Sequence, residues 1–366
     1  MPPTVLKYIG SKRRLVPVLG ELCERAGART ALDLFTGTTR VAQEFKRRGA
    51  YVTAVDTARY SEVLAQCYVV TDADAVDHEG LQHALTRLAA LPGTDGYVTR
   101  TFCRDARYFH PDNGRRIDAI RDGIDAAHPA GDPLRPLLLT SLLEAADRVD
   151  STTGVQMAYL KAWAPRALKP LELRAPVLLA GDGAAIRGDA RVAAAGLPTV
   201  DLAYLDPPYN QHSYYRNYHA WETIVAWDAP GHYGIACKRD DCREEANRSP
   251  FNSRRTFVGA LTALLAEVDA RLLVLSYNDE SWVALDELLE LCSGRGEVRA
   301  LAFDSKRYVG AQIGIHDLAG RRVGTVGRLR NVEYLVVAGA AADVRRVTDG
   351  MDGAVAARPD RPPTAA

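Results

Sequence analysis

The stretch Asp206-Pro207-Pro208-Tyr209 combines an acid, two prolines and an aromatic ring directly after the apolar run Val200–Leu205. Proline fixes φ and carries no N–H, so the carbonyls beside the two prolines face no competing backbone donor. The Asp206 carboxylate and the Pro207 carbonyl offer two acceptors for an NH2 group, and the Tyr209 ring offers a stacking face. The stretch therefore predicts a cradle for a planar, amine-bearing base. The alternative is that Pro-Pro only ends a strand, with Asp206 in its turn.

Other acids stand at or directly after predicted buried strands. Asp33 lies in Thr30–Phe35, Asp56 follows Tyr51–Val55, and Asp182 follows Pro176–Ala180. Open α/β sheets bind ligands outside the carboxyl ends of their strands, so these acids are candidates for one site. Carboxylates gathered at one edge repel each other without a cationic or donor-rich ligand, which makes a chance arrangement the less economical account.

The first two of these strands enclose a small-residue turn, Thr36–Thr39, and a predicted helix, Arg40–Arg48. This order is typical of half a doubly wound nucleotide-binding sheet. Gly37 lets the backbone pass close to a ligand, and Asp56 is placed to accept from both hydroxyls of a ribose. The turn lacks the G-x-G-x-x-G pattern of a dinucleotide site, and it better suits a cationic, phosphate-free ligand such as S-adenosylmethionine. An α/β unit with an incidental acid is the alternative.

A basic stretch, Lys7–Arg14, precedes the helical pattern Leu15–Ala26. Gly10 and Ser11 are typical of an N-terminal cap, which puts Lys12 near the first turn, where the helix dipole does not favour a cation. A ligand-facing role for Lys12 and a solvated basic turn fit this pattern about equally.

Residues that could contact a nucleic acid lie beyond the cradle. Tyr214, Tyr215 and Arg216 follow it closely and could hold an extruded base, although rings at helical spacing more often pack in a core. Lys306 and Arg307 belong to the strongest local basic patch, on a hairpin-like loop between residues 304 and 334, which predicts a phosphate clamp.

Composition limits the class of protein. Lys+Arg and Asp+Glu both number 46, so the net charge is zero and a nucleic acid must be met by a local patch. Six scattered cysteines fit a reduced cytoplasm better than a secreted disulfide framework. His232, Cys237 and Cys242 share one loop, but a zinc site needs a fourth ligand and a tighter pattern, so we predict no metal. We find no signal core and no run of about 18 apolar residues, and expect no contact with a membrane.

The spacing of the predicted elements indicates an insertion. About a hundred residues separate the second strand from the third, which is too long for a crossover. Apolar residues recur at helical spacing in Leu81–Leu91 and Leu134–Val149. We therefore predict a helical subdomain at 71–175, inserted into a core made of residues 1–70 and 176–340. Residues 341–366, rich in Ala, Gly, Asp and Pro, predict a disordered tail.

Taken in order along residues 5–340, these motifs resemble the bacterial Dam-type DNA adenine-N6 methyltransferases; they are Tyr8–Lys12, Asp33–Thr38, Asp56, Gly181-Asp182 and Asp206–Tyr209. The resemblance implies a Rossmann-like, S-adenosylmethionine-dependent methyltransferase sheet with its target-recognition domain in the insertion. It implies site-specific methylation of a flipped adenine in double-stranded DNA, in the bacterial cytoplasm at the nucleoid. The resemblance also suggests a cognate restriction nuclease as a further partner.

Carried over position by position, the resemblance implies that Asp206, Pro207 and Tyr209 hold the target adenine. The cofactor would meet Tyr8 and Lys12 at its methionyl part, Asp56 at its ribose and Asp182 at its adenine, over a floor made by Phe35 and Gly37. Asp33 is expected to be a further cofactor-binding residue. One residue departs from the family pattern: Thr39 stands where a second glycine is usual. A side chain there is expected to narrow the turn and reduce cofactor affinity.

Other functions remain open from the residues alone. A cytosine-N4 methyltransferase usually has Ser in place of Asp206, and enzymes acting on an RNA amine or a protein glutamine commonly have Asn there. A catalytically silent DNA-binding module and a nucleotide-binding regulator are the alternatives outside methyl transfer. The intact Asp206 argues against a silent module, and the large insertion favours duplex DNA over a small substrate.

Overall fold

The computed structural model describes residues 6–10, 12–157, 160, 162–306, 330–351 and 354–355. Eight strands of this part of the chain form one sheet in the order β10-β8-β9-β7-β4-β1-β2-β3. Their bounds are β1 (Thr30–Leu34), β2 (Tyr51–Asp56), β3 (Gly183–Arg187), β4 (Val200–Leu205), β7 (Ala270–Asn278), β8 (Glu297–Lys306), β9 (Arg330–Gly339) and β10 (Ala354–Val355).

Strand β1 is the pivot of this sheet. It pairs in parallel with β2 on one side, Ala31 opposite Val52, and with β4 on the other, Ala31 opposite Leu202. Strands β3 and β7 extend the parallel part, and β9, β8 and β10 add an antiparallel edge. The direction of the strand order therefore reverses beside β1, which is where open α/β sheets bind ligands. The predicted Rossmann-like α/β sheet is confirmed.

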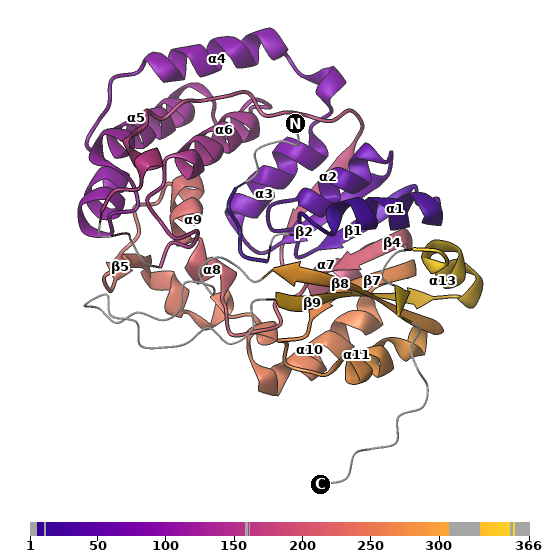
Figure 1. Cartoon of the computed structure of the whole chain (residues 1–366). Coiled ribbons are helices and arrows are strands. Elements are labelled where there is room, and N and C mark those ends of the chain that lie inside the picture. Colours follow the sequence, from indigo (N-terminus) through magenta and orange to yellow (C-terminus); the bar gives the residue numbers. More distant parts are fainter. Residues whose placement is uncertain are drawn as a thin grey trace.

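Helices cover both faces of the sheet (Figure 1). On one face lie α1 (Val16–Ala26), α2 (Arg40–Arg47) and α13 (Ala341–Thr348), and on the other α7 (Ala190–Ala195), α10 (Arg254–Glu267) and α11 (Leu285–Cys292). The helix α1 shows why: Leu19, Leu22, Cys23 and Ala26 recur at three- and four-residue spacing and are all buried. Gly27 then ends α1 in a left-handed conformation that glycine adopts without strain.

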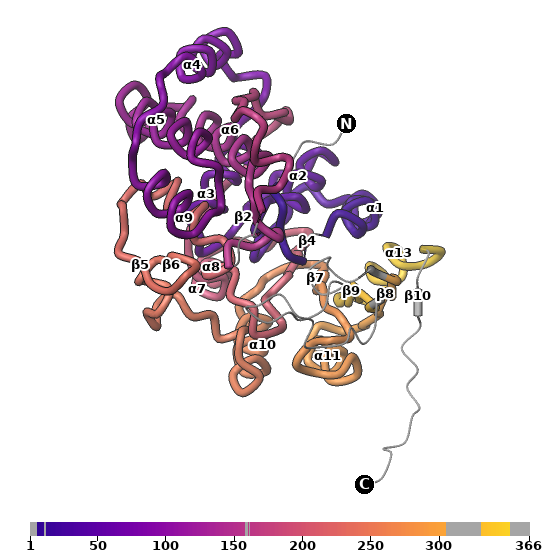
Figure 2. Tube along the Cα trace, turned by 60° about the vertical axis from the view of Figure 1, so that its left-hand side comes forward, coloured from indigo at the N-terminus to yellow at the C-terminus, as the bar shows by residue number. Residues whose placement is uncertain are grey.

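A second group of helices lies at one end of the molecule, away from the antiparallel edge (Figure 2). It shares a separate hydrophobic core, in which Phe102, Ile120 and Leu142 are fully buried. Its main helices are α3 (Arg59–Ala65), η1 (Gln66–Val70), α4 (His78–Ala90), η3 (Val98–Asp105), α5 (Pro111–Ala127), α6 (Arg135–Arg148) and α9 (His219–Ala226). Residues Tyr218 and Trp221 pack in this core although they follow β4 in the sequence. The division into a core and an insertion at 71–175 stays a prediction.

Short elements join these layers. They are η2 (Ala73–Ala75), η4 (Pro165–Leu168), α8 (Tyr214–Asn217), the hairpin β5 (His232–Tyr233) and β6 (Lys238–Arg239), η5 (Asp240–Arg243), η6 (Glu245–Asn247), η7 (Pro250–Asn252) and η8 (Ser293–Arg295). Among the described residues, no helix is long and apolar enough to cross a membrane.

Two sequence expectations are corrected by the structure. The third strand is Gly183–Arg187, not Pro176–Ala180, so Asp182 precedes this strand instead of following it. The predicted disorder of residues 341–366 is wrong for 341–351, because Val344 and Val347 of α13 and the following Met351 are buried against the sheet. Apolar residues at positions i, i+3 and i+7 give α13 a face to bury, which the composition of the tail concealed.

Candidate active site

A pocket of about 300 Å³ opens at the carboxyl ends of β1 and β4, where the strand order reverses. This volume lies at the lower limit of known small-molecule sites. The pocket is lined by parts of six segments: 8–12, 33–41, 55–60, 188–190, 204–215 and 246–252. Residues of the N-terminal basic stretch thus face the same cavity as Asp206 and Pro208 of the Asp-Pro-Pro-Tyr cradle. Pro207 and Tyr209 are not among the residues that line it.

The turn after β1 is held by Asp33. Its carboxylate accepts hydrogen bonds from the Thr36 hydroxyl at 2.7 Å and from the Ala42 amide at 3.1 Å, which ties the strand to the turn and to α2. Burial raises the pKa of Asp33 to about 7. Asp33 lines the pocket. Because its hydrogen bonds go to other protein groups, its position fits a role in shaping the cofactor side of the pocket better than a role in binding the cofactor directly.

Gly37 and Asp56 form the floor of the pocket together. The Asp56 carboxylate, at the end of β2, accepts from the Gly37 amide at 2.9 Å and from the Ala58 amide at 3.0 Å. A Cβ on Gly37 would lie only 3.1 Å from the Tyr8 ring, and the φ of Gly37 is +52°, so both space and conformation require glycine. Burial raises the pKa of Asp56, while its backbone N–H donors oppose that shift.

Thr39 does not narrow the pocket. It adopts a left-handed conformation, φ 62°, at the start of α2, and its side chain is fully buried away from the cavity lining. Its hydroxyl donates to the Thr38 carbonyl at 2.7 Å and accepts from the Gln43 side-chain amide at 2.9 Å. Local hydrogen bonds therefore offset the cost of the left-handed backbone conformation of Thr39. The expected steric effect on the cofactor has no basis in this geometry.

The acid at the carboxyl end of β3 is Asp189, which sequence reasoning missed. It lines the pocket, and its carboxylate caps α7 by accepting from the Arg191 and Val192 amides. Asp182 is exposed at the opposite end of the strand and does not line the pocket. The signal was present: Gly188-Asp189 repeats the Gly-Asp pair of 181–182 seven residues on, but Gly183–Arg187 holds a single β-branched residue and does not resemble a buried strand.

Lys12 and Asp206 form an ion pair at the centre of the pocket. The Lys12 ammonium lies 3.1 Å from the Asp206 carboxylate and 5.4 Å from the centre of the Tyr209 ring. Burial raises the pKa of Asp206 to about 6, although the Lys12 charge opposes the rise. Burial, the largest single effect, would lower the pKa of Lys12, but Asp206 together with Tyr209, Tyr204 and Glu333 outweighs it and holds that pKa well above its usual value. Both groups are therefore charged near neutral pH.

Three stacked tyrosines join the N-terminal segment to the residues after the cradle. The Tyr8 ring stacks on Tyr214 and on Tyr218 at centre distances of 5.1 Å and 4.5 Å, and the Tyr214 and Tyr218 rings stack on each other at 6.5 Å. The Tyr218 hydroxyl also accepts from the Ile9 amide at 2.6 Å. These contacts position Tyr8 over Gly37, so the predicted cofactor residue Tyr8 and the predicted DNA residue Tyr214 lie on one wall.

Segment 246–252 forms the wall opposite β1, and sequence reasoning missed it as well. Its Phe251 ring meets the Phe35 ring edge-on at 5.2 Å. The Asn252 side-chain amide donates to the carbonyls of Asn210 and His212 at 2.8 Å and 3.0 Å, which fixes the chain just after the cradle. No local pattern predicts such contacts, because they join positions forty or more residues apart.

The other protein residues that were predicted to contact DNA differ in their contacts. The Tyr215 hydroxyl donates to Asp241 at 3.0 Å and Arg216 donates to the Cys242 carbonyl at 3.0 Å, so both hold the loop before segment 246–252. Lys306 is the last residue of β8. Arg307 lies outside the described residues.

The chain matches known proteins over most of its length. A family model described as D12 class N6 adenine-specific DNA methyltransferase covers residues 8–290. The type II methyltransferase M.NlaIII of Neisseria lactamica is 31% identical over 317 residues, which are 83% of this chain and 92% of the relative. M.CviAII of Paramecium bursaria Chlorella virus 1 is 29% identical over 82% of this chain and 92% of its own length.

Longer relatives and solved structures match more loosely. The modification methylase StsI of Streptococcus sanguinis is 27% identical over 78% of this chain, which spans only 46% of that relative. Among solved structures, a putative methyltransferase from Streptococcus mutans is 12% identical and covers 90% of this chain and 50% of its own, with a TM-score of 0.34. A likeness this weak supports no argument about function.

Proposed function

We propose roles for the pocket residues on the premise that the chain belongs to the D12 class of N6 adenine-specific DNA methyltransferases. The chain is accordingly a site-specific DNA adenine-N6 methyltransferase, and S-adenosylmethionine is its cofactor. A cytosine-N4 or RNA methyltransferase is not the class that matches. The residue assignments below are our proposal, and the Asp206 carboxylate at the end of β4 is the observation that carries it.

Asp206 and Pro207 hold the target amine. The lone pair of an adenine amino group is delocalised into the ring, so the group is a weak nucleophile. Hydrogen bonds from its two N–H groups to the Asp206 carboxylate and the Pro207 carbonyl favour a pyramidal nitrogen aimed at the methyl group. A pKa of about 6 leaves Asp206 ionised near neutral pH, as this acceptor role requires. No covalent intermediate is needed.

Tyr209 and its neighbours receive the base. The Tyr209 ring packs edge-on against Tyr277 at 5.5 Å, which fixes its plane beside the cradle. Taking a base out of a duplex costs a few kcal/mol, and stacking on an aromatic ring returns about 1 to 3 kcal/mol per base. Tyr214 lines the pocket and supplies a second ring for the extruded nucleotide.

The other half of the pocket fits S-adenosylmethionine, which supplies the methyl group as a sulfonium. Asp56 offers a carboxylate for the ribose hydroxyls and Asp189 one for the adenine amine, replacing the role expected for Asp182. Phe35 and Phe251 offer an apolar slot for a flat base. Tyr8 and Lys12 face the methionyl end, and Gly37 leaves room for it. The donor and acceptor set suits a cationic ligand without phosphates.

We extend this proposal to the setting of the reaction. The DNA is double-stranded, and helices α4 to α6, in the predicted insertion at 71–175, read the sequence around the extruded base, as the helical insertion of the Dam-type family suggests. Lys306 and Arg307 contact phosphates. The enzyme acts at the nucleoid of a bacterial cytoplasm. Its similarity to type II methyltransferases suggests a cognate restriction nuclease as its partner.

Methyl transfer by Asp206 variants tests the assignment. The protein is incubated with labelled S-adenosylmethionine and unmethylated duplex DNA, and the DNA is digested to nucleosides. We expect label in N6-methyladenine for the wild type and none for Asp206→Ala, because the variant cannot accept from the amine. Cofactor binding, measured by calorimetry, is expected to survive in Asp206→Ala.

Asp201→Ala is the matched control, since Asp201 lies on the same strand but bonds to the Arg29 and Thr30 amides outside the pocket. Wild-type turnover by Asp206→Ala would refute the cradle role. Label found only in RNA, protein or N4-methylcytosine would refute the wider assignment.

A further inference from the structure

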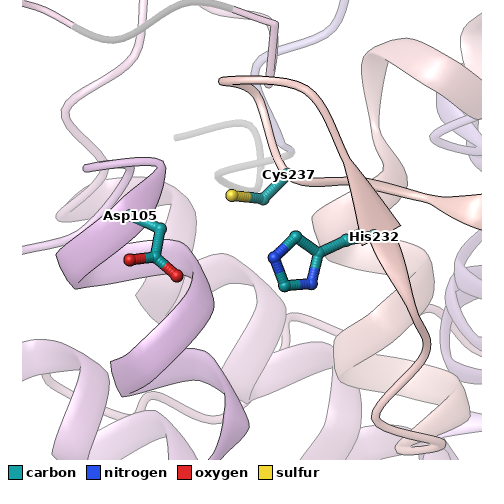
Figure 3. A group of neighbouring side chains, drawn as sticks. All are labelled: Asp105, His232 and Cys237. Carbon is teal, nitrogen blue, oxygen red and sulfur yellow. The ribbon is translucent and has the colours of Figure 1, made fainter.

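A cluster of three metal-ligating side chains lies outside the methyl-transfer pocket. Asp105, at the end of η3, and His232 and Cys237, on the hairpin β5–β6, place one ligand atom each within 4.8 Å of the other two. Figure 3 shows the three side chains converging on one point between the helix and the hairpin. The thiol is buried, whereas the carboxylate and the imidazole are exposed.

The backbone under this cluster is fixed without any ion. The Tyr97 hydroxyl donates to the Pro230 carbonyl at 2.8 Å, and the Tyr108 hydroxyl donates to the Ala236 carbonyl at 2.8 Å. The Tyr97 ring also meets the His232 ring edge-on at 6.4 Å. Both tyrosines come from the helical region, so they hold the hairpin beside η3 from two sides of the cluster.

The distances suit a small tetrahedral ion. Zinc binds sulfur, nitrogen and oxygen at about 2.0 to 2.3 Å, which puts neighbouring ligand atoms about 3.3 to 3.8 Å apart in a tetrahedron. Separations of up to 4.8 Å need a contraction of about 1 to 1.5 Å. The two exposed side chains can make that movement by changing rotamer, while Cys237, only 4% exposed, stays in place.

The sequence predicted no metal here, because its three candidate ligands lack a fourth ligand and a tighter pattern, and the structure brings together a different set. His232, Cys237 and Cys242 share a loop, but Cys242 is buried in η5 and does not belong to the cluster. Asp105 comes instead from a helix more than a hundred residues earlier. Ligands from two distant segments are typical of a site that cross-links a fold, and such pairs cannot be found by local spacing.

We propose that Asp105, His232 and Cys237 bind one zinc ion, with water as the fourth ligand, and that the ion fastens the hairpin β5–β6 to η3. The thiolate, imidazole and carboxylate are the three ligand types that zinc accepts in proteins. The hairpin leads through η5 to segment 246–252, so the ion would order the chain that forms one wall of the pocket. This inference does not depend on the roles proposed for the pocket residues.

Metal content and cobalt spectra test the site directly. The full chain is purified under reducing conditions without a metal-affinity tag, loaded with one equivalent of zinc and passed through a desalting column. We expect about one bound zinc per chain for the wild type, and loss of it in Cys237→Ser and in His232→Ala. With cobalt in place of zinc, a thiolate-to-metal charge-transfer band is expected in the wild type and not in Cys237→Ser.

Cys242→Ser is the matched control, because it removes a buried thiol five residues away and leaves the three ligands intact. It is expected to keep both the zinc and the charge-transfer band. Thermal unfolding gives an independent readout: a chelator should lower the melting temperature of the wild type and of Cys242→Ser, but not that of Cys237→Ser.

Three outcomes would overturn the proposal. The first is a wild-type protein that leaves the desalting column without zinc. The second is a Cys237→Ser variant that retains zinc and shows the wild-type cobalt spectrum. The third is a stoichiometry near one that is lost equally in Cys242→Ser, since that would place the ion elsewhere. Each result is readable whether or not the Asp206 assignment holds.

Discussion

Replacing Lys12 by methionine should shift the pH dependence of methyl transfer. Methionine keeps the length of the side chain and its contact with the Tyr209 ring, but it removes the charge 3.1 Å from Asp206. In the wild type, burial raises the pKa of Asp206 to about 6 while the Lys12 charge opposes the rise. Without that charge, the pKa of Asp206 must rise further.

The size of the shift follows from the geometry. An opposite charge within about 4 to 6 Å lowers the pKa of a carboxyl group by about 1 to 3 units, so its removal raises the Asp206 pKa to about 7 to 9. Near pH 7.5, a carboxyl with a pKa of about 6 is about 97% ionised, and the fraction falls to about 76% at the lower bound and about 3% at the upper. We take the ionised form as the active one, because a carboxylate accepts from the target amine more strongly than a neutral carboxyl does. Turnover near pH 7.5 should therefore fall by about 1.3-fold to about 30-fold.

Single-turnover rates against pH measure this effect. Enzyme in excess over unmethylated duplex DNA and saturating cofactor remove product release and cofactor affinity from the rate. The acidic limb of the Lys12→Met profile should lie at higher pH than that of the wild type, and the two rates should converge at alkaline pH. Arg14→Met is the control, because Arg14 is an exposed cation of the same turn, 3.5 Å from the Asp304 carbonyl.

Two results would refute this reasoning. A loss of rate that is equal at every pH would mean that Lys12 acts by another route than the charge of Asp206. An acidic limb that stays in place, or moves to lower pH, would mean that Lys12 does not stabilise the ionised carboxylate.

Three further changes have defined outcomes. Asp189→Asn keeps a capping side chain on α7 but removes a charged acceptor, so the cofactor Kd should rise by about 10- to 100-fold. Asp182→Asn should leave the Kd unchanged, and equal effects of the two substitutions would restore the assignment of the cofactor adenine to Asp182. Thr39→Gly should leave the cofactor Kd within about twofold of the wild type, because the threonine side chain points away from the pocket; tighter binding on titration would contradict this. Val344→Ala should lower the free energy of unfolding, measured in urea, by about 1.6 kcal/mol, because it removes two buried carbons at about 0.8 kcal/mol each. Replacing the exposed Arg345 by alanine should cost less than about 1 kcal/mol, and equal costs would mean that α13 is not packed against the sheet.

The sequence predicted the parts of the site that follow a clear strand. Asp56 and Asp206 each end, and Asp33 lies within, an apolar run that is buried on both faces of a parallel sheet, and such a run is visible without a partner. The prediction failed at β3, whose small residues are half-buried at the edge of the sheet. An apolar run just before it looked more like a strand, and Asp182 was chosen over Asp189.

Contacts between distant segments were beyond the sequence. The Lys12–Asp206 pair joins residues 194 positions apart, and the Phe35–Phe251 contact joins residues 216 apart. Each depends on the register of the whole sheet, which one sequence does not reveal. The roles of the pocket residues remain predictions. The predicted disorder was wrong for residues 341–351, because composition alone carries no information on which residues face the sheet.

The pairing of β1 with β4 has a consequence for how the protein is made. Ala31 lies opposite Leu202, so the central pair of the sheet cannot form until about 170 further residues have left the ribosome. At about 5 to 20 residues per second, β1, β2 and their helices wait roughly 10 to 30 s with one edge of β1 unpaired. The helices between them begin with local contacts, which form early, and Tyr218 and Trp221 complete their core soon after β4 has emerged. We therefore expect the helical region to fold first on the nascent chain and the methyl-transfer pocket last, since its final wall ends at Asn252.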